Sequence, residues 1–154
     1  MTPIVPVDLP AAEWHRDGYC LSTDRARIDV DTAHRFLSGE SYWAQNRSRA
    51  ALERAIAGSL PVGLYAPDGT MAGFARVVTD YSVFAYLLDV FVLPAHRGHG
   101  LASWLAAAIR THPDLLSVRT WMLATRDAHA VYEKAGYRAA PHPDYFMRVP
   151  EAGD

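Results

Sequence analysis

The spacing of hydrophobic and polar positions predicts a short strand and then two helices in the first part of the chain. The strand is expected at 19–22. The apolar residues Ala33, Phe36 and Leu37 then recur with the spacing of one helix face. A second helix is predicted over 47–57 by the same periodicity. Its inward-facing residues are expected to be Ala51, Leu52, Ala55 and Ile56.

The middle of the chain has the pattern of strands. Apolar runs at 60–65 and 71–78 flank Pro67-Asp68-Gly69, which has the composition of a hairpin turn. A third run, 84–92, is almost continuously apolar. Such a run is typical of a strand that is buried on both faces.

The last third returns to alternating helices and strands. Helices are predicted over 101–111 and 128–135, and the apolar segment 118–124 between them predicts a strand. Further strands are expected from Tyr137 and over 145–149. This order of elements predicts a mixed α/β (α+β) fold with a mainly antiparallel front half.

Length and composition narrow the class of protein. The 154 residues fit one domain, 1–154, with an irregular arm at 1–13. The net charge of −2, without a basic run, gives little support to a nucleic-acid partner. A single cysteine, Cys20, excludes an internal disulfide and a zinc framework, so no metal is expected.

The chain shows no sign of a membrane or secretory segment. No run approaches the roughly 18 apolar residues of a membrane span. The first ten residues include Pro3, Pro6 and Pro10 and lack the basic start and apolar middle of a signal peptide. We therefore expect a cytoplasmic protein without a membrane partner.

The most informative segment follows the strand at 84–92. Arg97-Gly98-His99-Gly100 forms a glycine-rich loop that leads into the helix beginning at Leu101. The first N–H groups of a helix lack intrahelical partners and lie at the positive end of its dipole, so they stabilise an anion. The two glycines leave the backbone open to a bulky phosphate, and Arg97 adds a positive charge.

Two nucleotide-binding motifs fit this loop poorly. A Walker loop needs a Lys-Ser/Thr pair after its last glycine, where this chain has Leu101-Ala102. A dinucleotide fingerprint belongs early in a parallel βαβ unit, whereas this loop lies late and follows a hairpin.

Two motifs together resemble those of the GNAT superfamily of N-acetyltransferases. The segment 97–102 matches Arg/Gln-x-x-Gly-x-Gly/Ala, and Tyr132-Glu133-Lys134-Ala135-Gly136-Tyr137 matches the later signature Tyr-Glu-Lys-x-Gly-Phe/Tyr. One predicted helix and one strand separate them, as in that family. The resemblance covers roughly 19–149 in element order, with the motifs within 84–137. It implies a twisted, mainly antiparallel central sheet flanked by helices.

The resemblance implies acetyl-CoA as the acetyl donor. Its pyrophosphate would bind the loop amides, and its pantetheine arm would lie beside the strand at 84–92, where that strand and the next splay apart. A bulge in the strand would allow this splaying. Phe91 and Val92 would offer backbone groups there, although both also fit a simple core strand. The cofactor-binding residues implied are Phe91, Val92, Arg97, Gly98, His99, Gly100, Leu101, Ala102, Ser103 and Thr125.

Thr125 stands where the family often has an asparagine near the pantetheine arm. Its hydroxyl could replace the amide as a hydrogen-bonding group. Asp127, two residues later, could cap the following helix.

Tyr132 is the catalytic residue that the resemblance favours most. When an amine attacks the thioester, a thiolate leaves, and a phenol with a pKa near ~10 can protonate it or donate a hydrogen bond to it. The alternative is a helix tyrosine that packs its ring in the core.

The general base is less well defined. The segment 88–92 resembles Glu-Asp-hydrophobic-hydrophobic-Val of the diamine N-acetyltransferases, but Leu88 occupies the glutamate position. Asp89 remains, either as a base or as a structural carboxylate bonded to a neighbouring loop or strand. Strict alternation would place Tyr86 and Leu88 on one face, and Leu87 and Asp89 on the other. If the active face is that of Tyr86, a tyrosine or a water chain must serve instead.

The acceptor would bind near the first two helices. Tyr42 and Trp43, with Tyr86, could hold a small amine, although Trp43 could equally pack the helices together. The expected activity is N-acetylation of a small-molecule primary amine by direct attack in a ternary complex, because Cys20 lies far from both motifs. The alternatives are a non-catalytic acyl-CoA sensor and a protein acetyltransferase. Family members are often dimeric, which makes a homodimer possible.

Overall fold

The computed structural model describes residues 9–154 and contains one six-stranded sheet. The strands are β1 (Glu13–Arg16), β2 (Tyr19–Ser22), β3 (Leu60–Tyr65), β4 (Met71–Thr79), β5 (Phe84–Val92) and β6 (Thr120–Met122). They lie in sequence order across the sheet. All neighbours are antiparallel except β5 and β6, which are parallel. This confirms the predicted mixed, mainly antiparallel fold.

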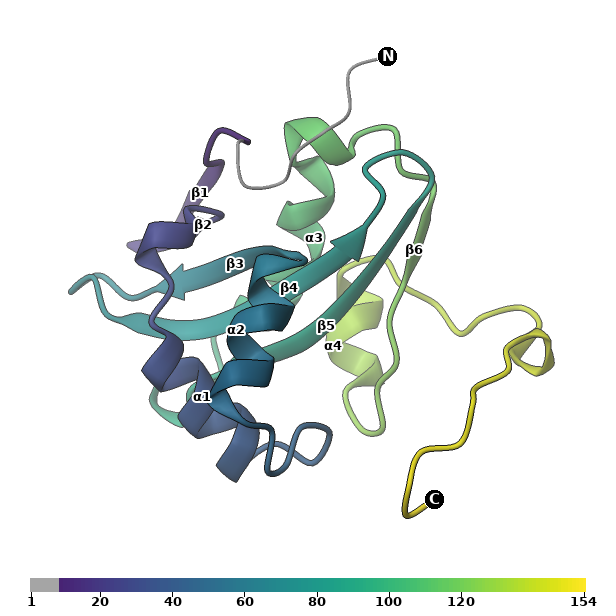
Figure 1. Cartoon of the computed structure of the whole chain (residues 1–154). Coiled ribbons are helices and arrows are strands. Elements are labelled where there is room, and N and C mark those ends of the chain that lie inside the picture. Colours follow the sequence, from purple (N-terminus) through teal and green to yellow (C-terminus); the bar gives the residue numbers. More distant parts are fainter. Residues whose placement is uncertain (1–8) are drawn as a thin grey trace.

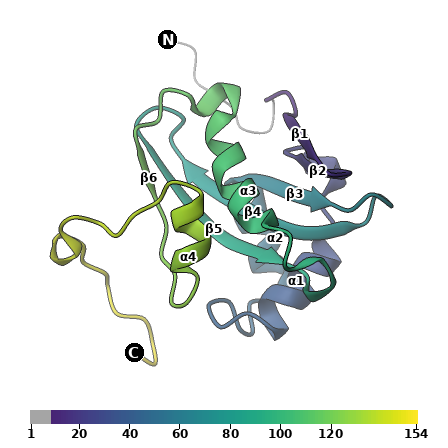
Figure 2. The same ribbon diagram turned by 180° about the vertical axis from the view of Figure 1, so that it is seen from behind.

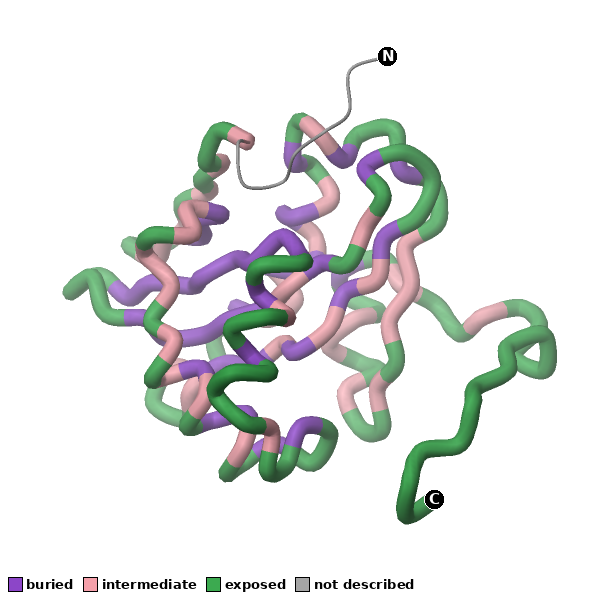
Figure 3. Tube along the Cα trace, in the orientation of Figure 1, coloured by how far each residue is buried: buried purple, intermediate pink, exposed green. Residues whose placement is uncertain are grey.

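Helices cover both faces of the sheet (Figures 1 and 2). They are α1 (Val30–Gly39), α2 (Arg49–Ala57), α3 (Leu101–Ala108) and α4 (His129–Lys134). Helices α1 and α2 pack against one face with Phe74 and Phe91, and α3 packs against the other face with Leu87. The buried positions accordingly follow the strands through the middle of the molecule (Figure 3).

The first two helices begin at side-chain caps. The Asp29 carboxylate accepts from the amide of Thr32, and the Ser48 hydroxyl accepts from the amide of Ala51. Each bond satisfies an N–H that the first turn leaves without a partner. The predicted inward face of α1 is confirmed. In α2 only Leu52 and Ile56 are buried, and the prediction for Ala51, which is exposed, was wrong.

An N-terminal hairpin begins at Glu13, the last residue of the segment predicted to be irregular, and includes the predicted strand at 19–22. β1 pairs with β2 through the turn at Asp17-Gly18, where both residues have positive φ, +52° and +82°. These angles are those of a two-residue hairpin turn, for which Asp-Gly is a favoured sequence. The hairpin signal was therefore present in the sequence and overlooked. Residues 1–8 of the predicted arm lie outside the described part.

The C-terminal segment also differs from the prediction. β6 spans three residues instead of 118–124, and no strand occurs in the described segment 137–154. A short 3₁₀ helix, Pro143–Tyr145, interrupts an otherwise extended arm that projects from the domain (Figure 1). Pro141 and Pro143 cannot donate backbone hydrogen bonds, and they restrict the residues before them to extended conformations. Within 9–154, no helix is long and apolar enough to cross a membrane.

Candidate active site

A β-bulge in β5 sets the geometry of the site. Phe74 and Arg76, two positions apart on β4, pair with Phe91 and Leu88, which are three positions apart on β5. β5 therefore holds one extra residue, and Asp89 takes the positive φ of +57° that is uncommon outside glycine.

The bulge interrupts the predicted alternation at Asp89, while Tyr86 and Leu88 share one face and Leu87 lies on the other, as predicted. Phe91 and Leu88 lie on the face of their partners Phe74 and Arg76, which is the face that α1 and α2 cover. Asp89 also reaches this face, because its carboxylate binds Arg76 and side chains that precede α2. The prediction that Asp89 and Leu88 point to opposite faces was wrong, because strict alternation assumes an uninterrupted strand.

β5 and β6 separate soon after they meet. Their pairing covers Phe84–Tyr86 of β5 and Thr120–Met122 of β6. Beyond Tyr86 no described strand pairs with this edge of β5, and Val90, Phe91 and Val92 line a cavity of about 670 Å³. The splayed strands and the bulge expected from the family resemblance are thus both present.

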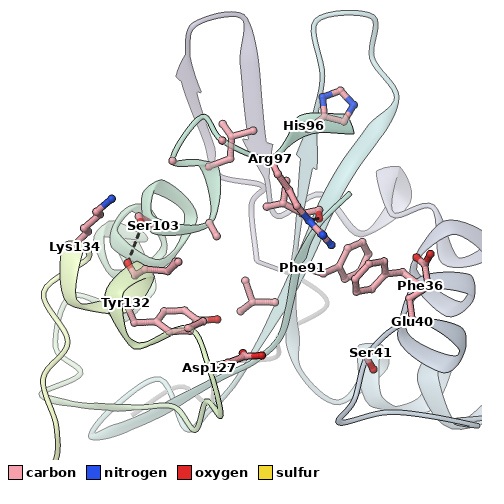
Figure 4. Close-up of a pocket in the computed structure, with 18 of the residues that line it drawn as sticks. Phe36, Glu40, Ser41, Phe91, His96, Arg97, Ser103, Asp127, Tyr132 and Lys134 are labelled. Atoms are coloured by element: carbon pink, nitrogen blue, oxygen red, sulfur yellow. Dashed lines mark hydrogen bonds between the residues drawn. The ribbon is translucent and has the colours of Figure 1, made fainter. Parts of the chain in front are cut away.

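The glycine loop forms one end of this cavity. Gly98 and Gly100 have positive φ, +85° and +68°, and α3 begins directly after Gly100. The side chain of Arg97 extends into the cavity beside the strand, and its Nε donates to the carbonyl of Val92 at 3.0 Å (Figure 4). The first-turn amides of α3 have no intrahelical partner, so they can bind an anion at this end.

Most of the predicted cofactor-binding residues are gathered here. The cavity wall includes Phe91, Val92, Arg97, Gly98, Gly100, Leu101, Ala102 and Ser103. His99 is not among the lining residues, and its carbonyl accepts instead from Arg16 at 2.8 Å, which ties the loop to β1. Thr125 also lies outside this cavity.

Tyr132 faces the strand side of the cavity from α4 (Figure 4). The Ser103 hydroxyl donates to the carbonyl of Val131 at 2.7 Å and fastens α4 to α3. The ring of Tyr137 meets that of Tyr132 edge to face, with centroids 6.1 Å apart. Burial, with a smaller contribution from Tyr42, raises the pKa of Tyr132 to about 12, so the phenol stays protonated at neutral pH.

A second cavity of about 600 Å³ continues from the first. The two share the wall formed by Tyr42, Trp43, Val90, Asp127, Ala128 and Tyr132. The second cavity is also lined by Tyr86 and Leu88, on the side away from the glycine loop. Together they form one cleft across the splayed strands, with Tyr132 where its halves meet.

The comparison with known proteins agrees with this architecture. A family model described as "Acetyltransferase (GNAT) family" matches residues 30–137. The chain belongs to the GNAT family of acetyltransferases. The match spans both helices of the α1/α2 face, the glycine loop and the Tyr132 motif.

Individual known proteins resemble the chain over most of its length. "Putative acetyltransferase FG08082" of Gibberella zeae is 33% identical over 79% of each chain. The crystal structure of a Xanthomonas campestris pv. campestris protein "belonging to the gnat family" is 42% identical, with a TM-score of 0.81, over 88% of this chain and 94% of that one. A Staphylococcus aureus structure described as "Probable Acetyltransferase", 23% identical with a TM-score of 0.65, shares the fold over 86% of this chain and 98% of that one.

In this GNAT domain, both carboxylate oxygens of Asp89 accept hydrogen bonds from other side chains. One carboxylate oxygen accepts from Trp43 Nε1 at 3.0 Å, and the other accepts from Arg47 at 2.7 Å and from Arg76 Nε at 2.5 Å. Its side chain is 1% exposed. Burial alone would raise the pKa of Asp89, but the hydrogen bonds from the two arginines outweigh it and hold the pKa below its usual value. These contacts favour the structural alternative for Asp89 over the role of a base.

Tyr42, Trp43 and Tyr86, which were predicted to bind the acceptor, all line the second cavity. Leu88 contributes an apolar side chain where the diamine N-acetyltransferases have a glutamate. The hydroxyl of Tyr42 accepts from the amide of Arg126 at 2.9 Å, and the guanidinium of Arg126 stacks 3.8 Å above the Tyr42 ring. This pair joins the α1–α2 loop to the β6–α4 loop across the cleft.

The expectation that Asp127 caps α4 was wrong. Asp127 does not cap the helix, whose N-cap residue is Ala128 without a side-chain bond. The hydroxyl of Thr125 instead accepts from the amide of Ala128 at 3.0 Å, which shapes the loop. Thr125 lines the second cavity, on the acceptor side.

Two contributors to the site were missed in the sequence. Arg76 lies within the apolar strand β4, and a charged residue at such a position signals a buried partner. Phe36 stacks on Phe91 with centroids 4.3 Å apart and closes the cavity from α1. The helical pattern showed Phe36 as a core residue, but nothing in it marked a position beside the cleft.

Proposed function

We propose that this acetyltransferase uses acetyl-CoA to acetylate the amine of a small molecule. The observation that carries the proposal is the single cleft, with an anion-binding loop at one end, a cavity of aromatic and charged side chains at the other, and Tyr132 between them. A donor and an acceptor that enter from opposite ends would meet at this tyrosine.

The residues present fit the donor. The loop amides from Gly98 to Ser103, with Arg97, would hold its pyrophosphate, since helix N-termini and glycine loops bind such anions. The open edge of β5 near Val92 would pair with the amide groups of its pantetheine arm. Acetyl-CoA supplies a thioester, from which the acetyl group passes to the amine as a C–N bond forms and the C–S bond breaks.

Tyr132 would donate a hydrogen bond or its proton to the leaving sulfur, and it would regain a proton from the nitrogen, which loses one as the amide forms. Its raised pKa keeps the hydroxyl protonated, and a phenol that stays protonated can bond to or protonate a thiolate. Cys20 lines neither half of the cleft, which supports direct transfer without an acyl-cysteine.

The acceptor would lose its proton without help from Asp89. Both Asp89 oxygens are occupied, and Leu88 offers no carboxylate. Asp127, at the shared wall, is 63% exposed and lies 3.7 Å from Arg126. Glu40 and Glu151, the remaining carboxylates in the two cavity walls, are exposed to solvent. We therefore propose that the amine reaches the thioester as a free base or passes its proton to water in the cavity, because a protonated amine has no lone pair.

A small acceptor fits the second cavity better than a protein chain. The bond between Tyr42 and Arg126 bridges the two loops that border this cavity, and its wall combines four aromatic residues with six charged ones. Aromatic rings beside charged groups can hold a small amine. An amine panel would identify the acceptor.

A second candidate function is that of a sensor that binds acyl-CoA without turnover. It is favoured by the absence of a free carboxylate at positions 88 and 89, because the oxygens of Asp89 are hydrogen-bonded and Leu88 is apolar. Release of free thiol from acetyl-CoA, measured with a chromogenic disulfide in the presence of an amine panel, separates the two. Amine-dependent thiol release that Tyr132→Phe reduces supports the acetyltransferase. Calorimetric binding of acetyl-CoA without thiol release for any amine would favour the sensor, and absence of binding would overturn both.

A further inference from the structure

Two arginines share one carboxylate beside the acceptor-side cavity. Arg47 and Arg76 both donate to the same oxygen of Asp89, at 2.7 Å and 2.5 Å, and the other oxygen accepts from the neutral indole of Trp43. The Asp89 side chain is 1% exposed, and among residues 9–154 neither guanidinium pairs with any other acidic residue. The group therefore holds two positive charges and one negative charge, so one positive charge is uncompensated.

Arg47 is the cation of this group that reaches the cavity. It lines the cavity of about 600 Å³ with a side chain that is 22% exposed, whereas Arg76 is 11% exposed and is not among the lining residues. A guanidinium has five N–H donors. Within the described part of the chain, the only hydrogen bond from the Arg47 guanidinium runs from Nη1 to Asp89. Arg47 can therefore offer unused donors and the uncompensated charge to a ligand in the cavity.

The α1–α2 loop holds Arg47 in place before a ligand arrives. Its amide donates to the carbonyl of Ala44 at 3.1 Å, and its carbonyl is bonded to His34 Nε2 at 2.9 Å. Asp89 holds the guanidinium from the strand side. A planar guanidinium that is already held loses little freedom on binding a second carboxylate, which favours recognition through two parallel hydrogen bonds.

The other charged residues of this wall are paired or exposed. Arg126 lies 3.7 Å from Asp127, with side chains that are 67% and 63% exposed, and Arg148 pairs with Asp154. Glu151 is also exposed. Charges in solvent are screened and contribute little to the field inside a cavity. The net positive charge thus stays with the buried group.

We propose that the acceptor is an amine that also carries a carboxylate, which Arg47 binds while the amine reaches the thioester beside Tyr132. A carboxylate has one negative charge and two oxygens, which match the uncompensated charge and the forked donors of the guanidinium. A diamine would instead bring a second ammonium to a positively charged wall, where it is repelled. The identity of the acceptor rests on the proposed function, whereas the carboxylate subsite can be tested by binding alone.

The first test compares matched amines as acceptors for the natural chain. A set such as phenylalanine, phenylalaninamide and phenethylamine keeps the side chain and varies only the carboxylate. Loss of the carboxylate raises the pKa of the amine and amidation lowers it, so an effect of the free-base fraction alone would place the acid between the other two. We expect the acid to exceed both by about tenfold or more in kcat/KM, as for a hydrogen bond to a charged group.

Further sets built on glycine, β-alanine and γ-aminobutyrate vary the distance between the amine and the carboxylate. The set with the largest preference for the acid gives the spacing that the cavity accepts. Equal rates for acid, amide and amine in every set would overturn the inference.

Variants then assign the preference to Arg47. Arg47→Gln should remove it, and Arg47→Lys, which keeps the charge without the fork, should keep part of it. The preference is a ratio of two rates on the same protein, so a partly unfolded variant does not change it. Arg49→Gln is the matched control, because this exposed arginine of α2 lies outside the cavity, and it should keep the full preference.

The outcomes separate this inference from the proposed function. Turnover of amines with a preference that Arg47→Gln leaves intact would overturn the carboxylate subsite and leave the acetyltransferase standing. If no amine is acetylated, the proposed function fails, and calorimetric titration of the same sets decides on the subsite. Tighter binding of the acid by the natural chain than by Arg47→Gln would retain the subsite, and equal binding would overturn it.

Discussion

Arg47 and Asp89 are 42 positions apart in the sequence, and Arg47 Nη1 lies 2.7 Å from the Asp89 carboxylate. The first belongs to the segment that leads into α2, and the second belongs to the bulge of β5. Arg76 and Trp43 complete the group, so one buried carboxylate joins β4, β5 and the acceptor-side loop.

Asp89→Asn should therefore destabilise the fold. Removal of one partner from a buried ion pair leaves uncompensated charge and costs about 3–5 kcal/mol, which urea unfolding would measure. Glu53→Gln is the matched control. Its ion pair with Arg49 is exposed, so the cost should be within about 0.5 kcal/mol. An Asn variant of unchanged stability that loses only turnover would restore Asp89 as a base.

The same carboxylate should affect stability in acid. Because its pKa is lower in the folded chain than in the unfolded chain, its contribution is complete above the ordinary Asp pKa near ~3.9. It is lost as the pH falls through the folded value. The natural chain should therefore lose more stability below about pH 4 than Asp89→Asn does. Equal acid sensitivity of the two proteins would contradict this assignment.

Tyr132→Phe should reduce turnover by roughly 10²-fold or more, as expected for loss of a general acid, with affinity for acetyl-CoA nearly unchanged. Tyr137→Phe is the matched control, because its ring contacts Tyr132 but does not line the cleft. Steady-state kinetics and calorimetry separate the two effects. Equal turnover in both variants would remove Tyr132 from the reaction.

The pH profile gives a second check on Tyr132. With its pKa raised to about 12, the phenol should not deprotonate between pH 7 and 10. No decline in kcat should arise from Tyr132 in that range. A decline near pH 10 that Tyr132→Phe removes would show an ordinary tyrosine pKa and contradict the burial described here.

Gly98→Ala should weaken acetyl-CoA binding about fivefold to tenfold. The added Cβ meets no atom within 4 Å, so the effect would come from a backbone with φ of +85°, where a non-glycine residue costs roughly 1 kcal/mol or more. Gly39→Ala also adds a Cβ in open space, but without a positive φ, and should leave binding unchanged. Equal binding by both variants would place the donor elsewhere.

Leu88→Glu should increase turnover with strongly basic amines near pH 7. The new carboxylate would enter the acceptor-side cavity and could take the ammonium proton that the natural chain leaves to water. Leu88→Gln adds similar bulk without a base and should give no gain. If the two variants behave alike with acceptors of high and low pKa, proton removal is not limiting.

Local patterns predicted the parts of the fold that depend on local chemistry. The α1 face, the hairpin between β3 and β4, and the glycine loop before α3 follow from periodicity and turn residues. The bulge did not, because it is visible only when β5 is set against β4. Asp89 adopts its positive φ where Arg76 and Arg47 bind it, and no local pattern contains all three.

The C-terminal segment 138–154 shows a different reason for a wrong prediction. Residues 145–149 are apolar apart from Arg148, which is typical of a strand, but a strand needs a neighbour, and the sequence does not say where that neighbour lies. The prolines at 141 and 143 were visible, and they argue against a hairpin within the chain.

The extra residue in β5 also makes this strand intolerant of a change in length. Insertion of one further residue at 88–90, with the bulge kept, would shift the alternation of every position of β5 before it. If Phe91 kept its place against Phe36, Tyr86 would turn toward the α3 side and the side chain of Leu87 would enter the acceptor cavity. A single-codon insertion, harmless in many loops, would thus exchange the lining of the cleft for part of the core.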